Sequence, residues 1–223
     1  MERFDLSEYV IVSDFDGTIT LEDSNALLVV ICGNDENAQI EVDFISGVMS
    51  NREALLRHFD VMRISLPDYK GFINSHIRMD PEFDSFLEHA HMRGIPIYIV
   101  SAGFRQAVEC VLGEQRLQGV EVFANDLRGE PYIMPSFATA HPVCEKPRGP
   151  CGHCKRDCLK AIREKSSQKI MYIGDGLTDR CAIEEADLVF AKDALAVYCE
   201  KHGMPYTEYR SFDDITSRLG SGT

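Results

Sequence analysis

Three short clusters in this chain combine carboxylates, a hydroxyl group and glycines in a way that suits the binding of phosphate or metal ions. Carboxylate oxygens are hard ligands for divalent cations, and glycine lets the backbone turn sharply close to a ligand. Asp is also costly to bury unless it is paired, so Asp next to apolar runs suggests a partner cation. The clusters are Asp14-Phe15-Asp16-Gly17, Ser101-Ala102-Gly103 and Gly174-Asp175-Gly176-Leu177-Thr178-Asp179.

Each cluster follows an apolar run that is typical of a buried strand, at residues 9–12, 95–100 and 169–173. The carboxyl ends of parallel strands lie at one edge of a sheet, where ligands bind, so we expect the three clusters to converge there. Taken singly, the residues have simpler interpretations. Asp14 can be a turn or cap residue, and Ser101 can be a helix N-cap.

From residue 80 onwards, helical and strand patterns alternate, which predicts an α/β fold with a doubly wound, mostly parallel sheet. The expected helices are 80–94, 107–112, 156–164, 194–201 and 213–219, the further strands are 120–123 and 188–191, a hairpin or meander lies within 127–136, and 137–153 is a loop.

Residues 21–79 show helical patterns without a competing strand pattern. Ser50 and Glu53 have capping-box spacing, and Pro67 is expected to end the helix that they begin. We therefore predict a small helical cap at 21–79, inserted into an α/β core of residues 1–20 and 80–223. The residues expected on the apolar helix faces are Ala26, Leu27, Val30 and Ile31, and then Leu55, Leu56, Phe59 and Met62.

Composition limits the classes of partner. The 223-residue chain is 44% hydrophobic and has a formal net charge of −13. That charge argues against nucleic acid, whose phosphates are bound by clustered Lys and Arg. The sequence shows neither a signal-peptide pattern nor an apolar run of the ~20 residues that a membrane span needs. We expect a cytoplasmic protein with no membrane partner, as a monomer or a homodimer.

The three clusters, in their order along the chain, resemble the first, second and fourth motifs of the haloacid dehalogenase superfamily, most of whose members are phosphatases. The third motif of that family is a Lys at the start of the helix before the last of the three strands. Lys155 fits this place, with Lys146 and Lys160 as alternatives.

The resemblance implies a Mg²⁺-dependent phosphomonoesterase acting on a small-molecule substrate. Mg²⁺ is implied at the Asp14 and Asp175 carboxylates and the Asp16 backbone carbonyl, with Asp179 direct or through water. Asp14 is then the nucleophile and Asp16 the general acid and base, while Ser101 and Lys155 hold phosphoryl oxygens. The implied substrate-binding positions are Phe15, Gly17, Thr18, Asp23, Ala102 and Gly103.

Within the superfamily, the helical insertion resembles the branch that contains phosphoserine phosphatase. That enzyme has Glu nine residues after the nucleophile, where this chain has Asp23. The sequence is more similar to MtnX-like phosphatases, whose namesake cleaves 2-hydroxy-3-keto-5-methylthiopentenyl-1-phosphate. Phosphoserine and phosphoethanolamine/phosphocholine phosphatases stay open as alternatives, as do phosphotransfer to a sugar hydroxyl and a noncatalytic regulatory module.

Substrate choice is expected to depend on the cap. A substrate carboxylate requires a cation there, and the candidates are Arg52, Arg57, Arg63 and Lys70. An uncharged leaving group suits apolar residues, of which Phe44, Phe59, Met62 and Phe72 can line a pocket or pack in the core.

Four cysteines gather before the third-motif Lys, at Cys144, Cys151, Cys154 and Cys158. With His153, they have the character of a structural zinc site. Packing at the start of a helix is the alternative interpretation.

Overall fold

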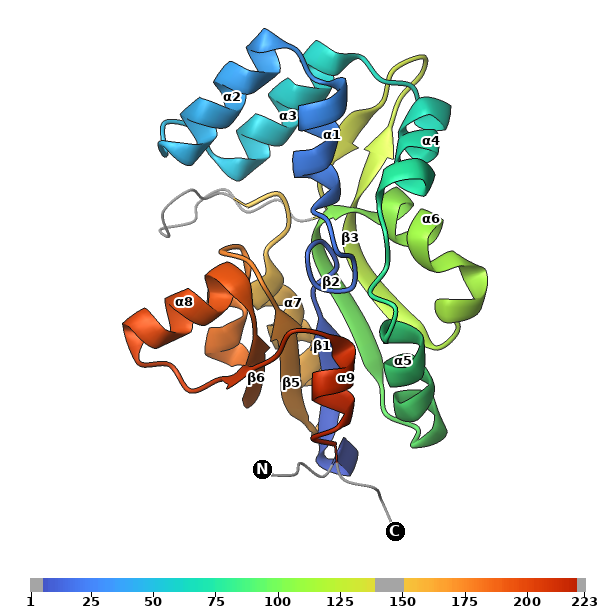
Figure 1. Cartoon of the computed structure of the whole chain (residues 1–223), viewed down its shortest axis with the longest axis vertical. Helices are drawn as coiled ribbons and strands as arrows, with labels where there is room; N and C mark the ends of the chain where they lie inside the picture. The colour runs from blue at the N-terminus through green and yellow to red at the C-terminus, as the bar shows by residue number, and fades with distance from the viewer. Residues whose placement is uncertain (1–5, 139–150, 220–223) are drawn as a thin grey trace.

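The computed structural model describes residues 6–138 and 151–219, which contain a seven-stranded sheet of order β4-β3-β2-β1-β5-β6-β7 (Figure 1). All neighbouring strands are parallel except β3 and β4, which form an antiparallel hairpin. The predicted α/β class and the predicted hairpin are thus confirmed. The strands are β1 Tyr9–Ser13, β2 Ile97–Phe104, β3 Val120–Arg128, β4 Met134–Ser136, β5 Lys169–Gly174, β6 Leu188–Ala191 and β7 Thr207–Glu208.

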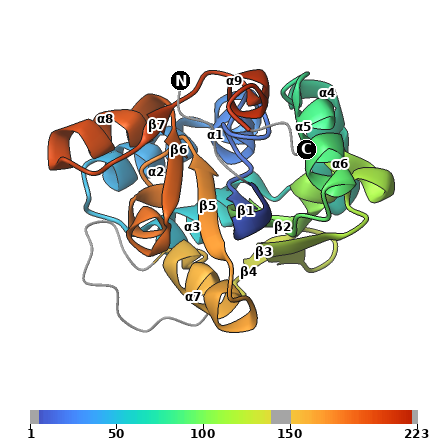
Figure 2. The same cartoon turned by 90° about the horizontal axis from the view of Figure 1, so that it is seen from below.

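Helices cover both faces of the sheet. Successive residues of a strand point to opposite faces, so a strand that is apolar throughout needs a packing partner on each face. In β1, Ile11 packs into one core cluster, whereas Val10 and Val12 pack into another. Figure 2 shows α5, α6 and α9 on one side of the sheet and α7 and α8 on the other. These helices are α5 Phe83–Met92, α6 Arg105–Arg116, α7 Lys155–Lys165, α8 Asp193–His202 and α9 Phe212–Thr216.

Two strands extend beyond the predicted ends. β2 continues through the Ser101 cluster to Phe104, so Ser101 lies inside a strand, and Phe104 takes the N-cap position of α6. β3 continues to Arg128, where it pairs with β4. These positions carry polar and small residues, so the sequence shows no apolar strand pattern there. The strands continue nevertheless, because hydrogen bonds from the neighbouring strands pair with the backbone and do not depend on the side chain.

The segment 21–79 forms four helices among the described residues, and they lie at the end of the molecule toward which β1 runs (Figure 1). The prediction for Pro67 was wrong. α3 ends earlier, where Arg63 adopts a left-handed conformation with φ of 50°, and Pro67 lies in the first turn of α4. Proline fits there because first-turn N–H groups have no intrahelical partner. The helices are α1 Ser24–Cys32, α2 Asp35–Ile45, α3 Asn51–Met62 and α4 Leu66–His76.

The predicted apolar face of α1 was partly wrong. Val30 and Ile31 are 78% and 49% exposed, whereas Leu28 is completely buried. Apolar residues fill most of this helix, so its sequence does not identify which side packs. In α3, Leu55 and Phe59 are buried as expected, but Leu56 is 37% exposed.

The chain enters and leaves the helical segment at one point. Thr20 and Met79 form an antiparallel bridge, Leu21 N donates to Arg78 O over 2.8 Å, and Asp80 N donates to Ile19 O over 2.8 Å. This geometry is what an insertion into the α/β core requires. The domain boundaries themselves remain a proposal.

The helical segment shares its apolar core with the sheet. Phe104, at the end of β2, packs edge-on against Phe59 of α3 at 5.2 Å and against Tyr69 of α4 at 6.4 Å between ring centroids. The β3–β4 hairpin is tied to the same region, because Ile133 N donates to Ile64 O over 3.0 Å. The segment is therefore held against the sheet by buried aromatic contacts. Within the described residues, no helix is both long and apolar enough to cross a membrane.

We expect Phe104→Ala to lower the free energy of unfolding by about 3–5 kcal/mol, because it leaves a cavity between α3, α4 and β2. Val30→Ala is the control, because an exposed substitution is expected to change stability by no more than about 0.5 kcal/mol. Urea unfolding followed by circular dichroism measures both. A Phe104→Ala loss below about 1 kcal/mol would show that the shared core is not stabilising.

Candidate active site

The predicted polar clusters meet at one edge of the sheet. The Asp14 cluster follows β1, the Ser101 cluster lies in the last part of β2, and the third cluster begins at the end of β5. These three strands are neighbours in the sheet, in the order β2-β1-β5. Asp14 N donates to Ile173 O over 2.8 Å, which fixes the first cluster beside the last strand of the three. Parallel pairing thus brings together residues that are more than 150 positions apart in sequence.

Lys155 lies at the centre of the acidic residues. It is the first residue of α7, and its Nζ lies 2.6 Å from Asp14 Oδ1 and 2.6 Å from Asp179 Oδ1. All three side chains are at least 95% buried. Of the alternatives, Lys160 is half exposed and lies 3.6 Å from Glu185, and Lys146 is outside the described residues.

Asp179 accepts four hydrogen bonds. Its Oδ1 accepts from Lys155 Nζ and from the Tyr172 hydroxyl, each over 2.6 Å. Its Oδ2 accepts from the backbone N–H groups of Asp175 and Gly176, over 3.1 and 2.9 Å. These donors occupy the lone pairs of both oxygens, so Asp179 holds Lys155 and the loop of Asp175 in place. Tyr172 was missed in the sequence, where it was one more apolar position of a buried strand.

Uncompensated negative charge characterises this site. Burial, together with Asp179, raises the pKa of Asp14 well above its usual value, although Lys155 opposes the shift. Burial and Asp179 likewise raise the pKa of Asp175 to about 6. Burial lowers the pKa of Lys155, but Asp14 and Asp179 outweigh it and raise that pKa above its usual value. One buried lysine therefore faces three carboxylates.

A divalent cation fits this donor set. Oxygens of Asp14, Asp175 and Asp179 all lie within 4.8 Å of one another. Mg²⁺ is a hard cation that is usually bound through one or two carboxylates together with substrate phosphate and water. Because the Asp179 oxygens are already occupied by donors, Asp14 and Asp175 are the carboxylates that suit direct coordination. The Asp16 side chain lies outside this group of carboxylates.

Asp16 lines the same pocket as Asp14, and its burial is intermediate. Its Oδ1 accepts from Ser24 N over 2.8 Å. Burial and the nearby Asp23 carboxylate raise the pKa of Asp16 to about 7, while the Ser24 hydrogen bond opposes the shift. A group with this pKa can both donate and accept a proton near neutral pH. Asp23 is also the N-cap of α1, where its Oδ1 accepts from Asn25 N and Ala26 N.

Of the predicted phosphate-binding positions, Phe15 N donates to Asp14 Oδ1 over 2.6 Å and so positions that carboxylate. Thr18 Oγ1 donates to Asp175 Oδ1 over 2.8 Å. Gly17 has φ of 74°, and a Cβ there would lie 2.4 Å from Asp175 Oδ2, so this approach requires glycine.

In the second cluster, Ser101 is fully buried, and its Oγ accepts from Gly103 N over 2.9 Å. A Cβ on Gly103 would lie 2.7 Å from Asp16 Oδ2. Ala102 and Gly103 line the pocket with Asp14, Asp16, Asp23, Asp175 and Lys155. Of the other predicted site residues, Phe15, Gly17, Thr18, Ser101 and Asp179 are not among its lining residues.

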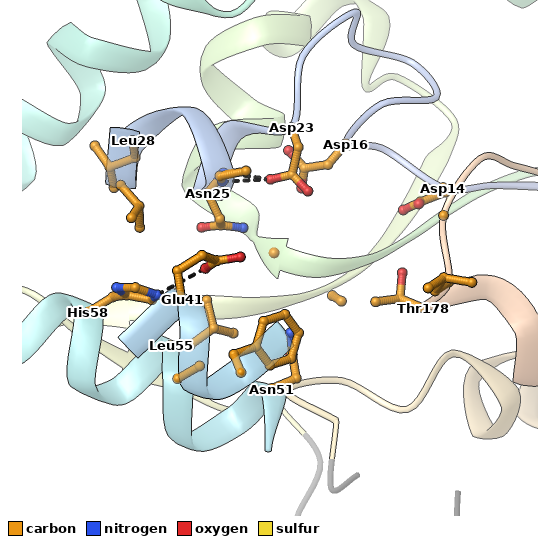
Figure 3. A pocket seen from close by; sticks show the side chains of 18 of the residues that line it. Asp14, Asp16, Asp23, Asn25, Leu28, Glu41, Asn51, Leu55, His58 and Thr178 are labelled. Carbon is orange, nitrogen blue, oxygen red and sulfur yellow. Dashed lines mark hydrogen bonds and ion pairs between the residues drawn. The ribbon is translucent and has the colours of Figure 1, made fainter. Parts of the chain in front are cut away.

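A pocket of about 310 Å³ lies between these residues and helices α1 to α3 (Figure 3). Its helical side carries polar groups that the sequence patterns did not indicate, from Asn25, Glu41, Asn51 and His58. Of the aromatic and Met residues for which pocket lining and core packing were both open, Phe44, Phe59 and Met62 line it, whereas Phe72 is buried against His76. Arg52, Arg57, Arg63 and Lys70, the proposed cap cations, are not among its lining residues.

The cysteines do not form a recognisable metal site in the described part of the chain, where the acidic group at Asp14 is the one found. Cys158, on the buried face of α7, lies in the core, and its Sγ is 2.9 Å from His153 Nε2. Burial raises the pKa of the Cys158 thiol to about 12, as for a cysteine packed among apolar side chains. These observations favour packing, and Cys144 lies outside the described residues.

Comparison with known proteins finds relatives whose sequences match this chain over nearly its whole length. Polyol phosphate phosphatase PYP1 of Saccharomyces cerevisiae is 27% identical and is matched over 94% of this chain and 92% of its own length. A 2-hydroxy-3-keto-5-methylthiopentenyl-1-phosphate phosphatase of Bacillus mycoides is 28% identical, over 92% of this chain and 93% of its own.

Among solved structures, phosphoserine phosphatase from T. onnurineus has a TM-score of 0.68 at 20% identity, over 96% of each chain. A substrate-bound phosphoserine phosphatase has a TM-score of 0.69 at 15% identity, over 99% of each. These two likenesses concern the fold. Residues 11–184 match the family model described as haloacid dehalogenase-like hydrolase. Since that match includes the Asp14, Ser101, Lys155 and Asp175 regions, the chain belongs to the haloacid dehalogenase-like hydrolase family.

Proposed function

We propose that this hydrolase is a Mg²⁺-dependent phosphatase of small phosphomonoesters that works through an aspartyl-phosphate intermediate. The observation that carries the proposal is the pairing of Asp14, fixed by Lys155 and Phe15 N, with Asp16, whose pKa is raised to about 7, in one pocket. A nucleophile and a proton donor are what the cleavage of a phosphate ester requires.

In the first step, an Asp14 carboxylate oxygen attacks phosphorus in line with the ester bond. The P–O bond to the alcohol breaks as the new P–O bond to Asp14 forms, and protonated Asp16 gives its proton to the leaving oxygen. Lys155 Nζ lies 2.6 Å from Asp14, and Ala102 and Gly103 line the same pocket, which supports a role for these groups in stabilising the charge that develops on the phosphoryl oxygens.

In the second step, water attacks the phosphorus of the aspartyl-phosphate. Asp16, now a carboxylate, takes a proton from this water, and the bond between Asp14 and phosphorus breaks to release inorganic phosphate. The site thus returns to its starting protonation state. Asp179 takes no part in bond making, because its oxygens hold Lys155, Tyr172 and the Asp175 loop.

Asp14 and Asp175 are the residues proposed to hold Mg²⁺. The cation supplies positive charge that allows a dianionic phosphate to approach three carboxylates. Retention of both Asp14 and Asp16 argues against a noncatalytic regulatory module, because phosphate binding alone does not need a nucleophile.

The pocket favours substrates without a carboxylate. Its positively charged lining group is Lys155, which already contacts Asp14 and Asp179, and its helical side adds Glu41 and Asp23. An acidic leaving group would therefore be repelled. Relatives named for a polyol phosphate and for methylthio-ketopentenyl phosphate support small uncharged leaving groups. A cytoplasmic location, no nucleic-acid partner and a monomeric or dimeric state remain predictions.

Asp14→Asn is expected to abolish turnover with Mg²⁺ while the fold persists, because the amide lacks the nucleophilic charge. Asp16→Asn is expected to lose ~10²–10⁴-fold in kcat, the usual contribution of a general acid. Phosphate release from a panel of phosphometabolites, with circular dichroism as the folding check, tests both. Ordinary activity of Asp14→Asn would exclude the covalent mechanism.

Binding of Mg²⁺ is expected to weaken by about tenfold or more per pH unit as the pH falls below about 6, because a proton on Asp175 competes with the cation. The raised pKa places this competition two units above the range of an ordinary Asp, near 3.9. Calorimetric titration between pH 5 and 8 would measure it. Asp175→Asn should lose the affinity, whereas the exposed Asp213→Asn is the matched control. Affinity independent of pH would contradict the assigned ligands.

Phosphoserine is expected to have a kcat/KM at least about tenfold below that of small uncharged phosphomonoesters, which corresponds to ~1.4 kcal/mol of transition-state binding. The physical reason is an unpaired carboxylate opposite Glu41 and Asp23. Side-by-side assays with phosphoserine, methylthio-ketopentenyl phosphate and a polyol phosphate decide it. Equal or better turnover of phosphoserine would favour the phosphoserine phosphatase assignment.

A further inference from the structure

Glu41 of α2 and His58 of α3 form a polar pair in the pocket that the proposed mechanism does not use. Glu41 Oε2 lies 3.5 Å from His58 Nε2, and both residues line the cavity opposite Asp14 (Figure 3). The His58 side chain is 5% exposed, whereas that of Glu41 is 40% exposed. The pair is therefore a preformed part of the wall, and its carboxylate is open to a ligand.

The hydrogen-bond network fixes which nitrogen of His58 carries the proton. Asn37 Nδ2 donates to His58 O over 3.2 Å and lies 3.1 Å from His58 Nδ1. Asn37 Oδ1 accepts from Asn34 N over 3.1 Å, which sets the orientation of this amide. Nδ1 is consequently an acceptor, and the ring hydrogen is on Nε2, where it faces Glu41 and the pocket. His58 thus provides an N–H donor beside a carboxylate acceptor.

Asn25 adds a second acceptor between this pair and the reaction site. Its Oδ1 is buried and has no hydrogen-bond partner within the described part of the chain. Its side chain extends across the pocket toward Glu41 in Figure 3. Its Nδ2 would be 3.0 Å from a Cβ on Gly103, next to Asp16 Oδ2. A buried acceptor without a partner loses stability, so a ligand donor at this point is favourable.

Leaving groups that carry a carboxylate, an ammonium group or hydroxyls differ in how they can hydrogen-bond to Glu41, His58 and Asn25. A carboxylate only accepts hydrogen bonds, so it cannot satisfy Glu41 or Asn25 Oδ1. An ammonium group only donates, so it can bind Glu41 and Asn25 Oδ1 but cannot itself accept a hydrogen bond from the His58 N–H. A hydroxyl group both donates and accepts, so neighbouring hydroxyls can satisfy all three residues.

We propose that Glu41, His58 and Asn25 form a subsite for the hydroxyl groups of a polyhydroxylated alcohol esterified to the phosphate. This inference rests on the proposed phosphatase function and specifies its substrate class. Glu41 and Asn25 Oδ1 accept hydrogen bonds from hydroxyls, and His58 Nε2–H donates one. Leu55 and Phe59 line the same pocket and cover the carbon chain.

The test compares erythritol 4-phosphate with butyl phosphate, which has the same four-carbon chain but no hydroxyls, using the full-length chain and Mg²⁺. The wild-type ratio of kcat/KM values should favour erythritol 4-phosphate. Glu41→Gln should lower that ratio by about tenfold or more, the loss that follows removal of a charged hydrogen-bond partner. Glu36→Gln is the matched control, because it removes one charge from the exposed side of the same helix and should not change the ratio.

Each other result overturns a distinct part of the inference. An unchanged ratio in Glu41→Gln, with normal thermal unfolding, would overturn the hydroxyl subsite and leave the phosphatase proposal intact. A larger loss with phosphoethanolamine than with erythritol 4-phosphate would show that Glu41 pairs an ammonium group. If the wild type hydrolyses no phosphomonoester in the presence of Mg²⁺, the proposed function itself fails, and the subsite with it.

Discussion

The placement of one buried lysine among three carboxylates is the constraint on which this structure depends. Lys155 Nζ bridges Asp14 and Asp179, and burial keeps water from screening the negative charge that remains. The raised pKa values of Asp14 and Asp175 are the physical sign of that imbalance. A site of this kind is costly in the absence of ligands, and the same imbalance makes it suited to a divalent cation.

The unfavourable free energy of the buried carboxylates is tolerated because strands and helices of the core hold their side chains in place. Asp14 and Asp175 end or follow paired parallel strands, and Lys155 starts a helix whose buried face packs on the sheet. Gly17 is required because a side chain there would collide with Asp175. Tyr172 and two backbone N–H groups hold Asp179. The geometry of the acidic group is thus set by the fold before any substrate binds, as electrostatic preorganisation requires.

Sequence patterns predicted the sheet and the meeting of the acidic clusters at one of its edges, because both have strong local signals. A buried strand followed by Asp14 is unusual enough to indicate a site, and three such strand ends indicate one edge. The patterns did not predict the face of α1, since an almost wholly apolar helix has no preferred side. They also did not predict that Pro67 lies in the first turn of α4. Tyr172 was missed because its hydroxyl partner is Asp179, whose position depends on the strand and loop geometry.

The proposed subsite for the leaving group was the least predictable part of the pocket, and the reason is physical. Glu41, His58 and Asn25 lie on three different helices and are spaced without any regular period, so only the packing of α1, α2 and α3 places them in one pocket. Of these helices, α3 is held against the sheet by Phe59, which packs on Phe104 at the end of β2 together with Tyr69 of α4. Phe104 follows Gly103, which lines the pocket, so this aromatic contact also ties α3 to the acidic edge of the sheet. The proposed leaving-group subsite and the proposed reaction site are therefore coupled through the shared core, although they use different elements of the chain.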